Sequence, residues 1–111
     1  MPKYMMLYRG EAIDISAMAP EEVAAEMALW GAWMEQVGTA LSDLGSPFGP
    51  GTSVVDDGST SSAGGTTGYS IVEADDMASA QAFAIGHPYL REGMGNYTID
   101  LFELMPVPFE D

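Results

Sequence analysis

The chain has 111 residues, enough for one hydrophobic core but not two, and 47% of them are hydrophobic, which excludes a disordered protein. Three basic residues stand against 17 acidic ones, giving a formal net charge of −14. Binding to nucleic acid or to an anionic membrane surface requires cationic side chains, so we expect neither partner. Because the acidic residues are spread along the chain, we interpret the charge as a source of solubility rather than as a site for a cationic partner.

The composition also bears on location and on cofactors. The chain contains no cysteine, which fits a reducing cytoplasm. No apolar run approaches the roughly 18 residues needed to span a bilayer, and the first residues, MPKYMMLYRGEAID, turn acidic too soon for a signal peptide. One histidine and no cysteine predict no metal site, and no haem, flavin or nicotinamide fingerprint is present. We therefore expect a cytoplasmic protein without a cofactor.

The first predicted elements are a strand and a long helix. Residues 3–8 (KYMMLY) form a short apolar run that predicts a strand covered on both faces. After a connecting loop, Pro20 is favourable in a first helical turn and predicts a helix from residue 20 to about residue 41. Apolar residues step along this helix by 4, 3, 4, 3 and 4, in a stripe expected to face the core: Val23, Met27, Trp30, Met34, Val37 and Leu41.

The middle of the chain is predicted to hold little regular structure. Glycine and proline punctuate residues 43–51, which argues against a helix or strand there. Residues 52–55 predict a brief strand, and residues 56–58 predict a turn. The Gly/Ser/Thr-rich residues 59–68 predict a flexible loop.

The second half begins with a strand followed by a well-bounded helix. Residues 69–74 predict the strand, and Asp75 and Asp76 offer carboxylates to the free N–H groups of a helix over residues 77–85. Gly86 is expected to supply a left-handed residue after the helix. A proline at position 88 prevents continuation of the helix.

A final strand is predicted over residues 97–105, followed by an extended tail over residues 106–111. The resulting order, β-α-β-β-α-β, is the ferredoxin-like arrangement of an α+β fold, and we expect residues 1–111 to form a single domain. Two helices can cover only one face of a four-stranded sheet, yet the strands carry apolar residues on both faces. We therefore expect a homodimer in which the open faces of two sheets pack together.

Four stretches of the sequence resemble the YCII-related (DGPF-type) family. They are KYMMLYRG near the start, PEE with MALWGAWMEQVGTAL in the helix, TGYSIVEADDMASAQAFAIGHPYL over residues 67–90, and YTIDLFEL in the last strand. The resemblance implies a dimeric α/β barrel of ferredoxin-like subunits. It also implies a poorly defined function, with small organic molecules bound between sheet and helices in relatives and a suspected catalytic His–Asp pair in some members.

Two residues are candidates for acid/base chemistry. His87 is the only side chain with an unperturbed pKa near neutrality, and the negative end of the preceding helix should favour its imidazolium form. It is either a general acid or base, an anchor for an anionic ligand, or a structural cap beside the following proline, which we favour. Asp43 follows the long helix and is either a carboxylate at the mouth of a cleft or an exposed loop acid. Members of the family with the suspected pair carry a histidine in the first helix, where this chain has LWGAW at residues 29–33.

Aromatic residues are candidates for the walls of a ligand site. Trp30 belongs to the predicted core stripe, whereas Trp33 lies off it and either packs in the core or faces a subunit interface or a ligand cleft. Phe48, Tyr69 and Tyr89 are further candidates for a pocket wall. The leading hypothesis is a small dimeric protein that binds a small organic molecule in a mostly apolar cleft. The alternatives are a cofactor-independent lyase, isomerase or hydrolase that uses Asp43 or His87, and a structural or regulatory dimer without a ligand.

Overall fold

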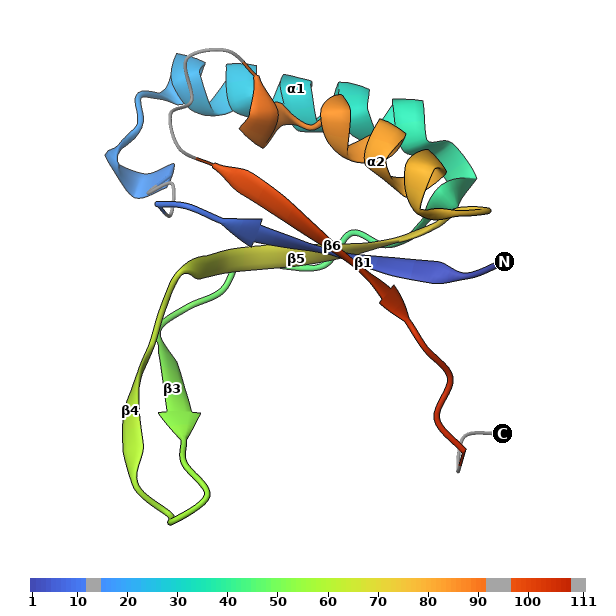
Figure 1. Cartoon of the computed structure of the whole chain (residues 1–111). Helices are drawn as coiled ribbons and strands as arrows, with labels where there is room; N and C mark the ends of the chain where they lie inside the picture. Colours follow the sequence, from blue (N-terminus) through green and yellow to red (C-terminus); the bar gives the residue numbers. More distant parts are fainter. Residues whose placement is uncertain (12–14, 92–96, 109–111) are drawn as a thin grey trace.

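The computed structural model describes residues 1–11, 15–91 and 97–108 of the chain (Figure 1). Its strands and longer helices are, in chain order, β1 (Lys3–Arg9), α1 (Pro20–Val37), β2 (Leu41–Asp43), β3 (Gly51–Val54), β4 (Thr60–Ala63), β5 (Thr66–Glu73), α2 (Met77–Ile85) and β6 (Thr98–Leu104). Short 3₁₀ helices cover Ile15–Ala17, Gly38–Ala40 and Pro88–Leu90. Four strands form one antiparallel sheet in the order β2-β5-β1-β6, and β3 and β4 form a separate hairpin.

Both long helices lie on one face of the four-stranded sheet (Figure 1). Alternate residues of β1 and β5 point toward the helices and are buried, as the two-residue period of a strand requires. The core formed between the two layers consists of Tyr4, Met6, Tyr8, Trp33, Val37, Val72, Ala74, Ala80 and Ala84. The protein therefore has the α+β, ferredoxin-like fold predicted from the order of its elements.

The second strand of this sheet is not the one predicted. Residues 52–55 were expected to fill that position, but they form β3 and the start of a turn, outside the sheet. The sheet instead takes Leu41–Asp43, because α1 ends at Val37 and Gly38, with a φ of 63°, redirects the chain toward β5. The helix predicted to end near residue 41 is thus about one turn too long. The segment predicted to be irregular, residues 43–51, begins at the last residue of β2.

The prediction of a flexible loop over residues 59–68 is also wrong. This region contains β4 and the first residues of β5, because β4 pairs with β3 across the turn at residues 56–58. That turn is confirmed: Val55 N–H donates to the Ser59 carbonyl at 2.8 Å, and Gly58 N–H donates to the Val55 carbonyl at 2.9 Å. The hairpin projects from the side of the sheet opposite the helices, and all residues of both its strands are exposed (Figure 1).

The buried face of α1 differs from the predicted stripe. Met27 and Met34 are 49% and 37% exposed, whereas the helix buries Glu26, Trp33 and Val37. Glutamate at a buried position was not anticipated because its charge is costly to desolvate without a partner. The helix is therefore turned so that a second apolar row, which includes the two methionines, is left uncovered by the chain's own core.

The predicted unit around α2 is confirmed in its bounds and its N-terminal cap. The Asp76 carboxylate accepts a hydrogen bond from the Ser79 N–H at 2.9 Å, and this bond lowers the pKa of Asp76. The left-handed conformation expected at Gly86 is wrong, since its φ is −86°. A Cβ at position 86 would lie 2.7 Å from Nε2 of Gln36, the end of a flexible side chain that would have to move aside.

The face of the sheet that points away from the helices carries many apolar side chains. Met5 lies between Ile71 of β5 and Phe102 of β6, and Phe102 is 54% exposed. Residues 109–111 of the predicted extended tail lie outside the described residues. Within the ranges that are described, no helix combines the length and hydropathy needed to cross a bilayer.

Candidate functional site

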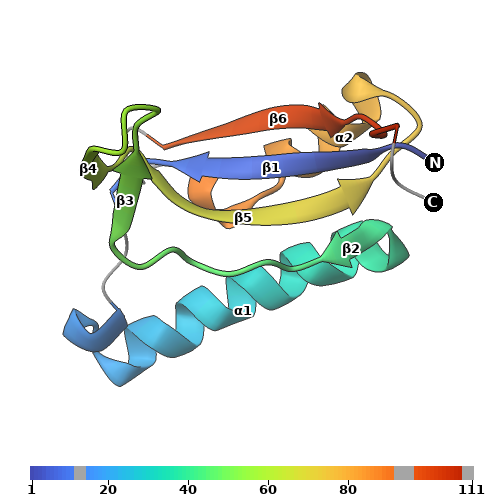
Figure 2. The same ribbon diagram turned by 90° about the horizontal axis from the view of Figure 1, so that it is seen from below.

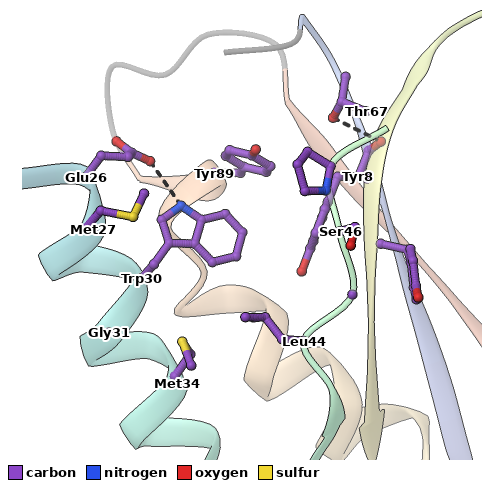
Figure 3. A pocket seen from close by; sticks show the side chains of 14 residues that line it. Tyr8, Glu26, Met27, Trp30, Gly31, Met34, Leu44, Ser46, Thr67 and Tyr89 are labelled. Atoms are coloured by element: carbon purple, nitrogen blue, oxygen red, sulfur yellow. Dashed lines mark hydrogen bonds between the residues drawn. The ribbon is translucent and has the colours of Figure 1, made fainter. Parts of the chain in front are cut away.

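A pocket of about 370 Å³ lies between α1 and the chain segment that follows β2 (Figure 3). Seen from below the sheet, this segment runs beside α1 on its way to β3 (Figure 2). The residues lining the pocket are Tyr8, Glu26, Met27, Trp30, Gly31, Met34, Leu44, Gly45, Ser46, Pro47, Thr67, Gly68, Tyr69 and Tyr89. The site is thus assembled from β1, α1, β5, the segment 44–47 and the 3₁₀ helix at Pro88–Leu90.

The walls of the pocket are mainly aromatic and thioether surfaces. Met27, Trp30 and Met34 project from α1 into the pocket, and the ring of Tyr89 closes the far side (Figure 3). The Trp30 and Tyr89 rings meet edge to face, with their centroids 5.3 Å apart, and Tyr89 also stacks on Tyr97 at 5.0 Å. Such walls favour flat, apolar molecules, which gain contact with ring faces and polarisable sulfur.

An ion pair holds the rim of the pocket. The Glu26 carboxylate is 2.7 Å from Nη2 of Arg91, and the Glu26 side chain is only 7% exposed. The Trp30 indole N–H also donates to Glu26, at 3.2 Å (Figure 3). Arg91 in turn donates to the carbonyl oxygen of Pro88 at 2.8 Å, which ties the end of this 3₁₀ helix to α1. Among the described residues that line the pocket, Glu26 is the only acid, and it is already paired with Arg91.

A buried chain of hydrogen bonds holds the opposite wall. The Tyr8 hydroxyl donates to the Ser70 hydroxyl at 2.5 Å, and Ser70 donates to the carbonyl oxygen of Leu44 at 2.5 Å. Burial raises the pKa of Tyr8 to about 12, so the phenol stays protonated. Beyond Leu44, Gly45 has a φ of 77°, and a Cβ there would lie 1.8 Å from the Tyr69 carbonyl oxygen. Only glycine allows the chain to leave the sheet at this point.

His87 lies directly behind the pocket, inside a group of aromatic rings. It is 1% exposed, and its Nδ1 accepts a hydrogen bond from the Tyr89 N–H at 3.0 Å. The proton of the neutral ring is therefore on Nε2, which has no hydrogen-bond partner in the part of the chain that the structure describes. Burial lowers the pKa of His87 to about 3. The expectation of an imidazolium form is thus wrong, because desolvation outweighs the effect of the preceding helix.

Family comparison agrees with this architecture. The model of the YCII-related domain matches residues 3–103. The chain belongs to the YCII-related domain family. A comparison with curated proteins finds no match.

In this YCII-related domain, Asp43 is an exposed residue that organises the end of β2. Its carboxylate accepts hydrogen bonds from the Gly45 N–H at 2.9 Å and from the Tyr69 hydroxyl at 3.2 Å. The bond to Asp43 raises the pKa of Tyr69. No hydrogen bond joins Asp43 to His87 among the described residues, whose contacts leave the two in separate networks. A catalytic role for either residue stays a prediction.

The predicted aromatic residues are distributed between the pocket and its surroundings. Tyr69 and Tyr89 line the pocket, whereas Phe48 stacks on Tyr69 at 6.0 Å and lines a smaller cavity of about 210 Å³ at the base of the hairpin. Trp33 is 1% exposed and donates to the Phe83 carbonyl at 2.9 Å, within the core. Trp30, assigned to the core by the sequence pattern, instead lines the pocket and is only half-buried.

Glu26 and Arg91 are site residues that the sequence pattern did not predict. The spacing of Glu26 and Trp30, four residues apart on one helix, is a signal for contact that was available. The pairing with Arg91 was not, because it joins residues 65 positions apart. Across the described residues, no group of three or more His, Cys, Asp or Glu side chains is placed to hold a metal ion.

Proposed function

We propose that this YCII-related domain binds a small, uncharged organic molecule in the pocket between α1 and the segment 44–47. The observation that carries the proposal is a formed pocket of about 370 Å³ with aromatic and thioether walls and few polar groups. Ligand pockets in proteins typically range from about 300 to 1,000 Å³ and share this lining. Met27 and Met34 are apolar yet exposed, and do not pack in the core. A ligand in the pocket would cover their side chains.

The charge of the site supports an uncharged ligand. Glu26 is already paired with Arg91, so a cationic ligand would have to compete with an ion pair 2.7 Å long. An anionic ligand would meet a chain with a formal net charge of −14. A flat, neutral molecule is subject to neither disadvantage and gains the ring and sulfur contacts.

We propose also that the functional form is a homodimer that packs two sheets face to face. The support is the apolar face around Met5, Leu7 and Phe102, which the helices leave uncovered. Apolar patches of this kind on a sheet face are usually buried by a partner. A second copy matches the patch by symmetry. The predicted cytoplasmic location, supported by a sequence without cysteine, belongs to the same proposal.

A pair of single-tryptophan variants tests the binding proposal. In Trp33→Phe the remaining tryptophan is Trp30 in the pocket wall, and in Trp30→Phe it is Trp33 in the core. Titration with neutral bicyclic aromatics (indane, 1-indanone and naphthalene) should produce a saturable change in emission with Trp33→Phe and a much smaller change with Trp30→Phe. The proposal fails if none of these compounds changes the emission of either variant up to its solubility limit.

A further inference from the structure

His87 lies inside a cluster of four aromatic side chains. The ring centroids of Trp30, Trp33, Tyr8 and Tyr89 lie 4.5, 4.6, 4.7 and 5.1 Å from that of His87. One imidazole nitrogen is used, since Nδ1 accepts from the Tyr89 N–H. The Nε2–H is buried and has no partner among the described residues. A buried donor without an acceptor costs free energy, and such groups are rare in native proteins and call for an explanation.

Three aromatic side chains connect the His87 ring to the pocket. Tyr8, Trp30 and Tyr89 each contact the His87 ring and each also line the pocket. A molecule in the pocket therefore needs to pass one layer of rings to reach Nε2. No other buried side-chain nitrogen or oxygen without a partner is found among the described residues.

The three rings differ in how firmly they are held. The Tyr8 hydroxyl is fixed by the buried Ser70, and Tyr89 is stacked on Tyr97. Trp30 is half-buried, and its only side-chain hydrogen bond in the described structure is the 3.2 Å contact to Glu26. Glu26 remains satisfied by Arg91 if the indole moves away. Trp30 can thus move at the cost of one 3.2 Å hydrogen bond, without breaking the Tyr89–Tyr97 stack or the buried Tyr8 hydroxyl contact.

Resting on the binding function proposed above, we propose that His87 is the polar anchor of the pocket. A displaced Trp30 lets a carbonyl oxygen or ring nitrogen of the ligand accept a hydrogen bond from Nε2–H. The ligand class is then a flat, neutral molecule with a hydrogen-bond acceptor at one end. Ligands that offer only donors find no matching acceptor at this nitrogen, because the neutral ring uses Nδ1 for Tyr89.

The test compares 1-indanone with indane, which have the same ring skeleton and differ in one carbonyl group. His87 is the only histidine, so ¹⁵N-labelled histidine gives a single Nε2–H signal in the intact protein. We expect 1-indanone to bind about tenfold more tightly than indane, the scale of one hydrogen bond to a buried donor. We also expect the Nε2–H proton signal to shift with 1-indanone and to stay in place with indane.

The possible outcomes separate this inference from the function beneath it. Equal affinities with an unmoved Nε2–H signal overturn the role of His87 and leave the pocket as a binding site. Absence of binding by both compounds at their solubility limits overturns the proposed function together with this inference. His87→Phe keeps an aromatic ring but removes the donor, and should bring the affinity ratio close to one. The matched control Ile85→Ala, at an exposed site on α2, should leave the ratio unchanged.

Discussion

Ser70 lies between Tyr8 and Leu44 and bonds to both, as acceptor from the Tyr8 hydroxyl and donor to the Leu44 carbonyl, each at 2.5 Å. These contacts link β1, β5 and the segment after β2, which are far apart in the sequence. Because the Leu44 carbonyl is satisfied by a side chain, the chain leaves the sheet after Asp43 without a buried, unpaired oxygen. The departing segment becomes one wall of the pocket.

Replacement of Ser70 by alanine should therefore destabilise the fold and loosen that wall. The Tyr8 hydroxyl and the Leu44 carbonyl each lose a buried partner, and we expect a loss of about 1–3 kcal/mol in the free energy of unfolding. Urea denaturation measures the effect. Ser62→Ala, in an exposed strand of the hairpin, is the matched control and should change stability by less than about 0.5 kcal/mol. Equal effects of the two substitutions would contradict a structural role for Ser70.

The stability of the protein should depend on pH through His87. The folded state keeps the ring neutral, with a pKa of about 3, whereas the unfolded chain takes up a proton near pH 6.5. The unfolded state thus binds more protons below pH 6.5, so this contribution to stability falls as the pH falls toward 3. Between pH 7 and pH 5, the stability difference between the wild type and His87→Phe should move by about 2 kcal/mol against the wild type.

An independent readout avoids reliance on the variant. The carbon-bound protons of the single histidine should give the same chemical shifts at pH 7 and pH 5 in the folded protein. A titration with a midpoint near 6.5 would show that the imidazole is not desolvated.

The ion pair at the rim should contribute both stability and order in the pocket. Glu26→Gln removes the charge that faces Arg91, and we expect a loss of about 2 kcal/mol in the free energy of unfolding, because Glu26 is buried while Arg91 is partly solvated. Trp30 loses its charged acceptor, so its emission should also change. Glu35→Gln, at an exposed position of the same helix, is the control and should alter neither quantity.

The proposed dimer predicts an asymmetry between the two faces of the fold. Phe102 is 54% exposed on the open face of the sheet, and Ile85 is 76% exposed on α2 in the other layer. Light scattering at micromolar concentration should give the mass of a dimer for the wild type and for Ile85→Lys, and a shift toward monomer for Phe102→Lys, because a buried unpaired lysine opposes association. A monomeric wild type would refute the dimer.

The parts of the fold that were predicted correctly are those determined by neighbouring residues. Asp76, the apolar residues of α2 and the proline beyond it act within a few positions of one another, and the helix bounds follow from them. β2 was missed because three residues cannot show a period, and because it is a strand only through its pairing with β5. The serine and threonine residues of β4 predicted a loop. They form a strand because their backbone groups pair with those of β3.

The difference between local and long-range contacts also explains which residues of the site were predicted. Tyr69 and Tyr89 were expected in a ligand site; both are among the residues that line the pocket, and their role in binding stays a prediction. Trp30 was assigned to the core but lines the pocket, on the same helix as Glu26, whose buried carboxylate pairs with an arginine 65 residues away. The sequence of the helix alone does not predict the pairing with Arg91.

The segment after β2 also covers part of the edge of β5. Ser46 and Phe48 bond to β5, since the Tyr69 N–H donates to the Ser46 carbonyl at 3.3 Å and the Phe48 N–H donates to the Thr67 carbonyl at 2.8 Å. Pro47, between them, has no N–H to offer. An uncovered strand edge is a template for the addition of strands from other molecules, and this segment occupies the groups that would serve. This wall of the pocket therefore also protects the protein from aggregation. A deletion in the segment that enlarged the pocket would expose the edge of the sheet.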